Sequence, residues 1–379
     1  MKFLHTSDLH LGLRLCEKPM NEDISHLLNE IVIIAEAEKC DAVIVAGDIY
    51  DRSNPGADSV VIFDRFVTEL AERNITVMAV SGNHDSPERV AYMSDILGRM
   101  GVHFSPVYCG DITPVTLKDQ YGEVCFWLIP FLRPSTVRAI HGDFDGENYT
   151  DAVKYVIDQL SIDKTKRNVL VTHQFVVGSN ADDKENVGGI MAVDSSVFDG
   201  FCYTALGHLH SAHYAGSKLV RYSGSPLKCS FSEVDDKKTV DIVEIDAFGE
   251  LQLKQIGLHP IHDMRELRGS YDEVMSLKYR ETGKTDDYLR IVLTDEEDIQ
   301  DVVAKLRTVY PNLLRLTYDN TRTRDYRSVD SVSVEEMDVL RAEDVFAELY
   351  ELQNNVAPDE KIMEIVKTII DDIRGEEGI

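Results

Sequence analysis

Positive charge is scarce in this sequence of 379 residues, which has 39 Lys and Arg against 67 Asp and Glu and a formal net charge of −28. Non-specific binding to nucleic acid draws most of its affinity from Lys and Arg side chains that displace counterions from phosphates. The net charge therefore argues against a surface built mainly to neutralise phosphates. If the chain acts on DNA, we expect another component to supply much of the basic surface.

Paired cysteines and long apolar runs are missing as well. No apolar run approaches the roughly 20 residues of a membrane helix, and Met1 leads directly into a strand-like segment rather than a signal peptide. No CxxC pair and no dense disulfide spacing occurs among the six single cysteines, which are Cys16, Cys40, Cys109, Cys125, Cys202 and Cys229. We therefore expect a protein of the reducing cytoplasm with no membrane partner.

Short apolar segments of strand character alternate with helix-like stretches from Met1 to about Leu258, a pattern typical of a layered α/β domain. Each of the following segments ends at a polar cluster: Phe3–His5, Ala42–Ala46, Ile75–Val80, Val169–Val171 and Tyr203–Leu206. In open α/β sheets ligands bind beyond the carboxyl ends of the strands. We therefore expect these clusters to converge on one site, although they lie far apart in the sequence.

The pattern changes after residue 258. A strand at Tyr288–Leu293, a helix at Glu296–Arg307 and a strand at Leu313–Tyr318 predict a small α/β module, followed by a polar linker at Asp319–Asp330. The sequence thus divides into residues 1–258, residues 259–325 and residues 331–379. No internal repeat points to a solenoid.

Residues 331–379 hold 14 acids and 4 bases, yet they also carry two apolar stripes at helical spacing. The stripes consist of Val345, Phe346, Leu349, Tyr350 and Leu352, and of Ile362, Ile365, Val366, Ile369, Ile370 and Ile373. Such helices either pack on their own protein's core or form a docking surface for another chain. The pattern alone leaves both interpretations open.

The first two polar clusters combine carboxylate and imidazole groups. Asp8 and His10 stand two residues apart in an extended segment, so their side chains point to the same side and can hold one cation. Gly47 follows an apolar strand and lets the backbone turn, which presents Asp48 at the strand end. The two oxygens of a carboxylate such as Asp48 can bridge two cations.

The third cluster, Asn83-His84-Asp85, is the most specific, because three such groups in succession after an apolar strand are costly to place in a core without a purpose. His173 forms the fourth cluster, and the alternating His208 and His210 form the fifth. A lone histidine at a strand end is more often structural than a ligand, but the ordered series favours ligands. The remaining histidines lack this context and are interpreted as structural: His5, His26, His103, His141, His213, His259 and His262.

Oxygen and imidazole ligands without thiolate fit manganese or iron better than structural zinc. We expect two Mn²⁺, with Mg²⁺, Fe²⁺ or Zn²⁺ as alternatives. Two cations about 3.5–4 Å apart can activate a water and stabilise charge during in-line attack on a phosphoryl group, which predicts phosphate-ester hydrolysis. His84, supported by Asp85, is the candidate catalytic acid for the leaving oxygen. A GxSxG elbow and a P-loop are absent from the sequence.

Taken in order, the motifs DxH, GDxxD, GNHD, H and GHxH between Asp8 and His210 resemble those of the calcineurin-like metallophosphoesterases. Further segments narrow the resemblance to the SbcD-type nucleases of double-strand-break repair: Phe3–Gly12, Pro130–Pro134, Ala205–His210, Tyr222–Pro226 and Phe231–Glu233. The resemblance implies a four-layered β-sandwich flanked by helices. It also implies a small α/β capping domain that directs DNA to the site and a helical C-terminal segment that binds the coiled coil of an SbcC-like ATPase.

The same resemblance implies a ligand set. One manganese would be bound by Asp8, His10, Asp48 and His210, and the other by Asp48, Asn83, His173 and His208, with Asp48 as the bridge. Archaeal relatives have a histidine three residues after the bridging aspartate, where this chain has Asp51. A role that depends on that histidine is therefore not carried over.

The activity implied by the resemblance is that of a manganese-dependent nuclease, a 3′–5′ exonuclease on double-stranded DNA and an endonuclease on single strands. It would act in the bacterial cytoplasm as a homodimer within an SbcCD-like heterotetramer that processes DNA ends and hairpins in repair, replication and recombination. The metal site alone also permits a phosphoprotein phosphatase or a cyclic-nucleotide phosphodiesterase. A mainly structural subunit that tethers DNA ends is the alternative of another class.

Overall fold

The structure is a computed structural model that describes residues 1–178 and 192–321, together with residues 346, 347, 350, 358, 362, 363 and 366. Most of the predicted linker and of the C-terminal apolar stripes therefore lies outside the described residues. By their contacts the residues form two units, Met1–Val292 with Ile299–Thr317, and Leu293–Asp298 with Tyr318–Ile379. Within the described residues no helix has the length and apolar content that crossing a membrane requires.

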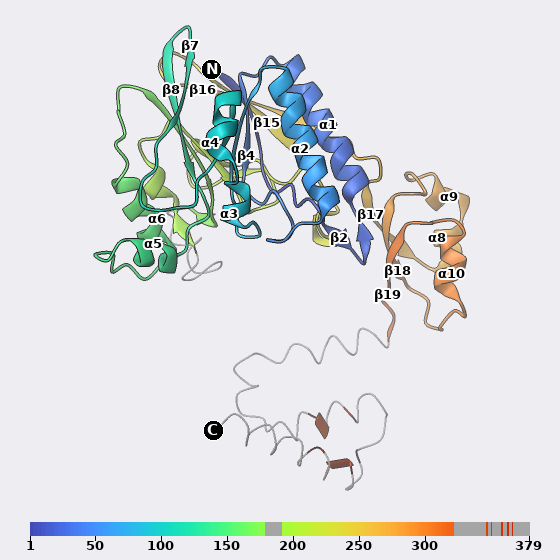
Figure 1. The fold of residues 1–379 in the computed structure, drawn as a ribbon. Helices are drawn as coiled ribbons and strands as arrows, with labels where there is room; N and C mark the ends of the chain where they lie inside the picture. Colours follow the sequence, from blue (N-terminus) through green and yellow to red (C-terminus); the bar gives the residue numbers. More distant parts are fainter. Residues whose placement is uncertain are drawn as a thin grey trace. The chain divides into compact units, whose positions relative to one another are not determined.

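Two six-stranded sheets form the first unit's centre (Figure 1). The first sheet has the order β16 (Leu251–Gly257), β15 (Thr239–Ile245), β1 (Lys2–Thr6), β4 (Ala42–Ala46), β5 (Thr76–Val80) and β6 (Val102–Phe104). The second has the order β13 (His213–Tyr214), β14 (Val220–Tyr222), β12 (Tyr203–Gly207), β9 (Arg167–His173), β8 (Gly122–Ile129) and β7 (Val115–Asp119). Strands β1, β4, β5 and β6 are parallel, as are β14, β12, β9 and β8. The five predicted strands are all present.

The layers follow from the alternation of side chains along each strand. In β4, Ile44 faces the core between the two sheets, where it joins Phe3 and Phe126, whereas Val43 and Val45 belong to the core on the sheet's other face. That outer core includes buried residues of α1 (Asn21–Ala37) and α2 (Ala57–Glu72). The outer face of the second sheet packs in the same way on α6 (Tyr149–Asp158). The expected four-layered α/β fold is confirmed.

The helix α1 illustrates how the sequence selects these layers. Its buried residues Ile24, Leu27, Leu28 and Ile31 recur at helical spacing and form one apolar face. The other described helices are α3 (Pro87–Val90), α4 (Ser94–Leu97), α5 (Pro134–Ile140), α8 (Tyr271–Met275), α9 (Leu277–Arg280) and α10 (Val302–Arg307). Shorter elements are η1 (Gly98–Met100), η3 (Ser195–Phe198), η4 (Phe231–Glu233), β2 (Arg14–Leu15), β3 (Lys18–Pro19), β10 (Val176–Val177) and β11 (Val193–Asp194).

A three-stranded sheet follows the sandwich in the chain, with the order β17 (Met264–Gly269), β18 (Tyr288–Leu293) and β19 (Leu313–Tyr318). The last two strands agree with the predicted bounds, but β17 was not predicted. The predicted helix start at Glu296 is wrong, because α10 begins at Val302. Glu296 instead accepts hydrogen bonds from Thr321, and the carbonyl oxygen of Asp295 accepts one from Asn320, so this segment is held in a bend.

Asp23 of α1 joins the sandwich to the residues of this sheet. Its side chain is fully buried. It accepts hydrogen bonds from the backbone N–H of His262 at 2.8 Å, from Nδ1 of the same residue at 3.0 Å and from the hydroxyl of Tyr288 at 2.7 Å. His262 is thus a structural residue, as the sequence indicated.

Candidate metal centre

The loops at the carboxyl ends of β1, β4, β5, β9 and β12 bring the predicted ligands together. Asn83 lies between two histidine rings, with its Oδ1 3.0 Å from Nε2 of His173 and 2.9 Å from Nδ1 of His208. Nε2 of His173 also lies 3.3 Å from Oδ2 of Asp48. These side chains form one half of the centre.

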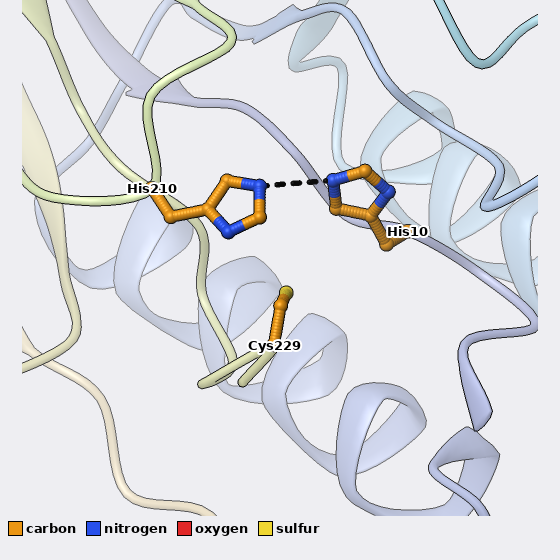
Figure 2. A group of neighbouring side chains, drawn as sticks. All are labelled: His10, His210 and Cys229. Atoms are coloured by element: carbon orange, nitrogen blue, oxygen red, sulfur yellow. Dashed lines mark hydrogen bonds between the residues drawn. The ribbon is translucent and has the colours of Figure 1, made fainter. Parts of the chain in front are cut away.

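The other half lies across the Asp48 carboxylate. Nε2 of His10 is 3.1 Å from Nε2 of His210 and 3.9 Å from Oδ2 of Asp48 (Figure 2 draws the two rings). One ligand atom from each of Asp8, His10 and Asp48 lies within 4.8 Å of the others. The Asp48 carboxylate therefore stands between the two groups of predicted ligands.

The backbone is strained at these positions. Asp8, His10, Asp48 and His208 have φ angles of 53°, 43°, 48° and 111°, in the region that residues with a side chain seldom adopt. Such a conformation costs on the order of 1–3 kcal/mol per residue and persists only where the surrounding structure imposes it. The strain lies at four of the seven predicted ligand residues, which supports a functional role for the cluster.

Two glycines allow the loops to approach closely. A Cβ atom at Gly82 would lie 2.1 Å from Oδ1 of Asp48, and one at Gly207 would lie 1.9 Å from the carbonyl oxygen of Ala46. Both distances are far below van der Waals contact. Glycine is therefore required at both positions for steric reasons.

Hydrogen bonds fix the orientation of the predicted ligands. His173 donates Nδ1–H to the carbonyl oxygen of Ala46 at 2.9 Å, which turns its Nε2 toward the centre. Asp8 accepts hydrogen bonds from the Ser7 hydroxyl at 2.6 Å and from the backbone N–H of His208 at 3.1 Å. The ligand geometry is thus imposed by the protein itself.

Glu233 supports His210 and was not identified as a site residue from the sequence. Its Oε1 lies 3.0 Å from Nδ1 of His210, and its Oε2 accepts hydrogen bonds from Nζ of Lys238 at 2.6 Å and from the backbone N–H of Cys229 at 3.1 Å. Carboxylates of this kind orient metal-binding histidines. The only sequence signal for Glu233 was its place in the segment Phe231–Glu233, one of the segments that carry the resemblance.

Protonation states in the centre follow from burial and from neighbouring charge. Burial lowers the pKa of His208 to about 4 and also lowers that of His10, so both rings are neutral at pH 7, as ligands must be. Although burial opposes it, Asp48 raises the pKa of His173 to about 9. Although burial opposes it, His173 in turn holds the pKa of the Asp48 carboxyl well below its usual range.

His84 lies at the centre, but Asp85 does not support its ring. Nδ1 of His84 donates to the backbone carbonyl oxygen of Asp51 at 3.0 Å, and Nε2 lies 4.0 Å from Oδ2 of Asp48. Asp85 is buried and accepts three backbone N–H bonds, from Ile49, Tyr50 and Gly82. The expected support of the His84 ring by Asp85 is therefore wrong. The Asp85 carboxylate instead holds the loop after β4 and the loop after β5 together, because backbone N–H groups of both loops point toward it.

The donor set fits divalent cations. Asp8 and Asp48 are 1% and 2% exposed, and burying carboxylates requires a compensating charge. Within the described residues, the ionisable groups within 4.0 Å of the Asp48 carboxylate are the rings of His10, His84 and His173 rather than lysine or arginine. Buried carboxylate oxygens and imidazole nitrogens that converge in this way match the ligand preference of such cations.

Comparisons with known proteins agree with this assignment. The family described as calcineurin-like phosphoesterase matches residues 1–211, and SbcD_C, described as type 5 capsule protein repressor C-terminal domain, matches residues 260–354. The SbcD subunit of the SbcCD nuclease from Staphylococcus epidermidis is 31% identical over 323 residues, which covers 84% of this chain and 85% of that protein. Its counterpart of the same name from Staphylococcus saprophyticus is 30% identical over 350 residues, covering 91% and 90%.

Solved structures with a similar fold include TT1561 of Thermus thermophilus and a dimetal phosphatase of Danio rerio, each with a TM-score of 0.41 and 12% identity. The first match covers 67% of this chain and 98% of the other, and the second covers 69% and 98%. At these values the likeness decides nothing about the site.

Fold and donor set together define a metal-dependent phosphoesterase, an enzyme that uses divalent cations. The match over residues 1–211 covers more than half of the chain. The chain belongs to the calcineurin-like phosphoesterase family and, within it, to the family of SbcD subunits of SbcCD nucleases.

Proposed function

We propose that this protein is a manganese-dependent DNA nuclease, a 3′–5′ exonuclease on double-stranded DNA and an endonuclease on single strands. The observation that carries the proposal is the convergence of carboxylate, amide and imidazole groups around Asp48, in a chain related to proteins named as nuclease subunits. Its role would be to process DNA ends and hairpins in repair, replication and recombination. The cytoplasmic location expected from the unpaired cysteines belongs to this proposal.

We assign the cations to two ligand sets that share Asp48. Asp8, His10, Asp48 and His210 would hold one Mn²⁺, and Asp48, Asn83, His173 and His208 the other. The distances of 3.3 Å from Asp48 to His173 and 3.9 Å to His10 support a bridging carboxylate. Bound cations would supply an activated water and neutralise charge on the phosphoryl group.

His84 is the proposed catalytic acid. Its side chain is 45% exposed, so a substrate can reach it, and the Asp51 carbonyl oxygen fixes its Nδ1. In the imidazolium form of the ring, Nε2 would also carry a proton, which it could give to the leaving oxygen. The group that orients the His84 ring is the backbone carbonyl of Asp51, so this role does not depend on the side chain at position 51.

Asp85 is a positioning residue in this proposal. It accepts N–H groups from the loop that carries Asp48 and from Gly82, next to Asn83. Loss of its carboxylate would release both loops and misplace ligands without touching the substrate.

The domain organisation and the partner extend the proposal. Residues 1–258 would be the nuclease domain, residues 259–325 the cap that directs DNA, and residues 331–379 the segment that binds an SbcC-like coiled-coil ATPase. The SbcD_C match at residues 260–354 supports the first boundary. Such a partner would also supply the basic surface that a chain with a net charge of −28 lacks.

This part is tested by co-purification of the partner ATPase with the full chain and with a chain that ends at residue 330. We expect capture by the full chain alone. Equal capture by both chains would contradict the assignment of the tail.

A second copy of this chain is the proposed partner for an apolar surface on the first sheet's side of the sandwich. Six large apolar side chains there are 45–71% exposed: Val60, Val61, Tyr92, Met93, Ile96 and Met100. Three of them, Val60, Tyr92 and Met100, line one pocket, and exposed apolar side chains that gather in this way are typical of an interface. A homodimer implied by the family would cover it. Val61→Glu should therefore shift the sedimentation mass from dimer to monomer, whereas Ile33→Glu, at an exposed position of α1, should not.

The nuclease activity is tested with the full chain on a short DNA duplex labelled at the 3′ or 5′ end, and on p-nitrophenyl phosphodiester and monoester substrates. We expect cleavage of DNA and of the diester with Mn²⁺, early loss of a 3′ label, and no reaction in EDTA. Asp48→Asn should abolish cleavage, and Asp64→Asn, a substitution in α2, is the matched control. Hydrolysis of the monoester alone would favour a phosphatase, and tight DNA binding without any hydrolysis would favour a tethering subunit.

A further inference from the structure

One of the described cysteines belongs to a cluster with two of the proposed manganese ligands. A ligand atom from each of Cys229, His10 and His210 lies within 4.8 Å of the other two. Figure 2 shows the Cys229 sulfur pointing toward the space between the two rings. Among the described cysteines, Cys229 is the one that belongs to such a group.

Hydrogen bonds to Glu233 fix the position of Cys229 beside His210. It lies between β14 and η4, and its backbone N–H donates to Oε2 of Glu233 at 3.1 Å. The other oxygen of Glu233 lies 3.0 Å from Nδ1 of His210. One carboxylate thus holds both the thiol residue and a ring that faces it. Cys229 is also partly exposed, so a cation can reach the thiol from solvent.

The imidazole nitrogens of the cluster are available for a cation. His210 donates Nδ1–H to Glu233, so in the neutral form that a metal ligand requires the ring would carry its lone pair on Nε2, 3.1 Å from Nε2 of His10. His10 is 5% exposed, and its Nδ1 has no hydrogen-bond partner in the described structure. Two nitrogens that bind the same cation at about 2.0–2.1 Å lie about 3.3–3.4 Å apart at the tetrahedral angle that zinc prefers. The observed separation is close to this value.

We propose that Cys229, His10 and His210 form a binding site for a thiophilic divalent cation of the Zn²⁺ or Cd²⁺ type. Sulfur and imidazole donors select such cations, whereas manganese prefers oxygen and nitrogen. As the sulfur–metal bond forms, the thiol gives its proton to solvent, and no oxidant or reductant is needed.

Occupation of this site excludes manganese from the first ligand set. His10 belongs both to the cluster with Cys229 and to the cluster with Asp8 and Asp48. One ring nitrogen cannot bind two cations at once, so a zinc ion held by Cys229 competes with the manganese assigned to His10 and His210. This competition rests on the proposed two-manganese function, while the thiol site itself does not.

The test uses the full chain and Cd²⁺ as the probe. We expect a sulfur-to-cadmium charge-transfer band in the ultraviolet that saturates at about one ion per chain. The band is lost in Cys229→Ser and in Cys229→Ala. It is kept in Cys202→Ser, the matched control at a partly buried thiol that donates to the carbonyl oxygen of Asn168. Equal bands in Cys229→Ser and Cys202→Ser would overturn the proposal, provided that thermal unfolding shows both variants folded.

A second measurement follows displacement of Mn²⁺ by Zn²⁺ through the electron paramagnetic resonance signal of free manganese. Cys229→Ser should need at least about tenfold more zinc than the wild type for the same release. Displacement at the same zinc concentration in both proteins would overturn the proposal. If the wild type shows the Cys229-dependent band but does not cleave DNA, the thiol site stands and the nuclease function fails. Cleavage of DNA with manganese and no band in the wild type would overturn the thiol site alone.

Discussion

Glu233→Gln is the substitution that best tests the groups that orient the predicted ligands, because it removes none of those ligands. Glutamine keeps the size of the side chain but loses the negative charge beside Lys238, whose side chain is 6% exposed. Although burial opposes it, hydrogen bonds from His210 and Lys238 lower the pKa of Glu233 to about 2, so the wild-type side chain is ionised at pH 7. The substitution therefore leaves a buried ammonium group without its nearest counter-charge.

Two magnitudes follow from these contacts. Removing one partner of a buried ion pair costs about 3–5 kcal/mol. Nζ of Lys238 keeps contacts with the carbonyl oxygen of His210 at 3.0 Å and with the Ser225 hydroxyl at 3.1 Å, so we expect about 2–3 kcal/mol. Loss of a carboxylate that orients a metal-binding histidine typically weakens metal affinity by about 10–100-fold.

The assay is urea unfolding in EDTA, followed by titration with Mn²⁺ in a calorimeter. Glu244→Gln is the control, because Glu244 is 54% exposed on β15 and its loss should change the free energy of unfolding by less than about 0.5 kcal/mol. The reasoning would be refuted if Glu233→Gln unfolded like Glu244→Gln and bound manganese within about twofold of the wild type.

Three further substitutions test other parts of the molecule. His84→Gln should lower kcat on DNA by about 10²–10⁴-fold with both manganese ions retained. Metal content is measured by mass spectrometry, and loss of metal in the variant would instead make His84 a ligand. Hydrogen bonds from the Arg167 guanidinium hold the pKa of Asp119 well below its usual range, so its contribution to stability is present above about pH 4 and is lost as the pH falls. Asp119→Asn should therefore cost about 1–2 kcal/mol at pH 7 and flatten the acid side of the stability profile, and an unchanged acid limb would contradict this. Asp23→Asn weakens the bonds to His262 and Tyr288, so KM for duplex DNA should rise while kcat on the p-nitrophenyl diester is kept, and equal loss on both substrates would count against a DNA-directing cap.

Local signals in the sequence predicted the strands of the sandwich well. Ala42–Ala46 is an uninterrupted apolar run, and β4 has the same bounds, because a strand buried on both faces needs apolar side chains at every position. The helix α10 was predicted less well. The acidic segment that begins at Glu296 was predicted to be helical. In the structure this segment instead forms hydrogen bonds with Asn320 and Thr321, and no local sequence pattern reveals these partners.

By itself, the sequence determined where the five predicted strands lie along the chain, which polar residues follow them and hence the kinds of donor that gather at the centre. Tertiary structure alone decided which groups support them: the Glu233 carboxylate behind His210, the Asp51 carbonyl oxygen behind His84 and the Asp85 carboxylate between two loops. Strand-end donors follow from periodicity along the chain, which is a local property. Contacts such as that of His210 with Glu233, 23 residues apart, depend on how loops pack after folding, so only the three-dimensional arrangement brings them together.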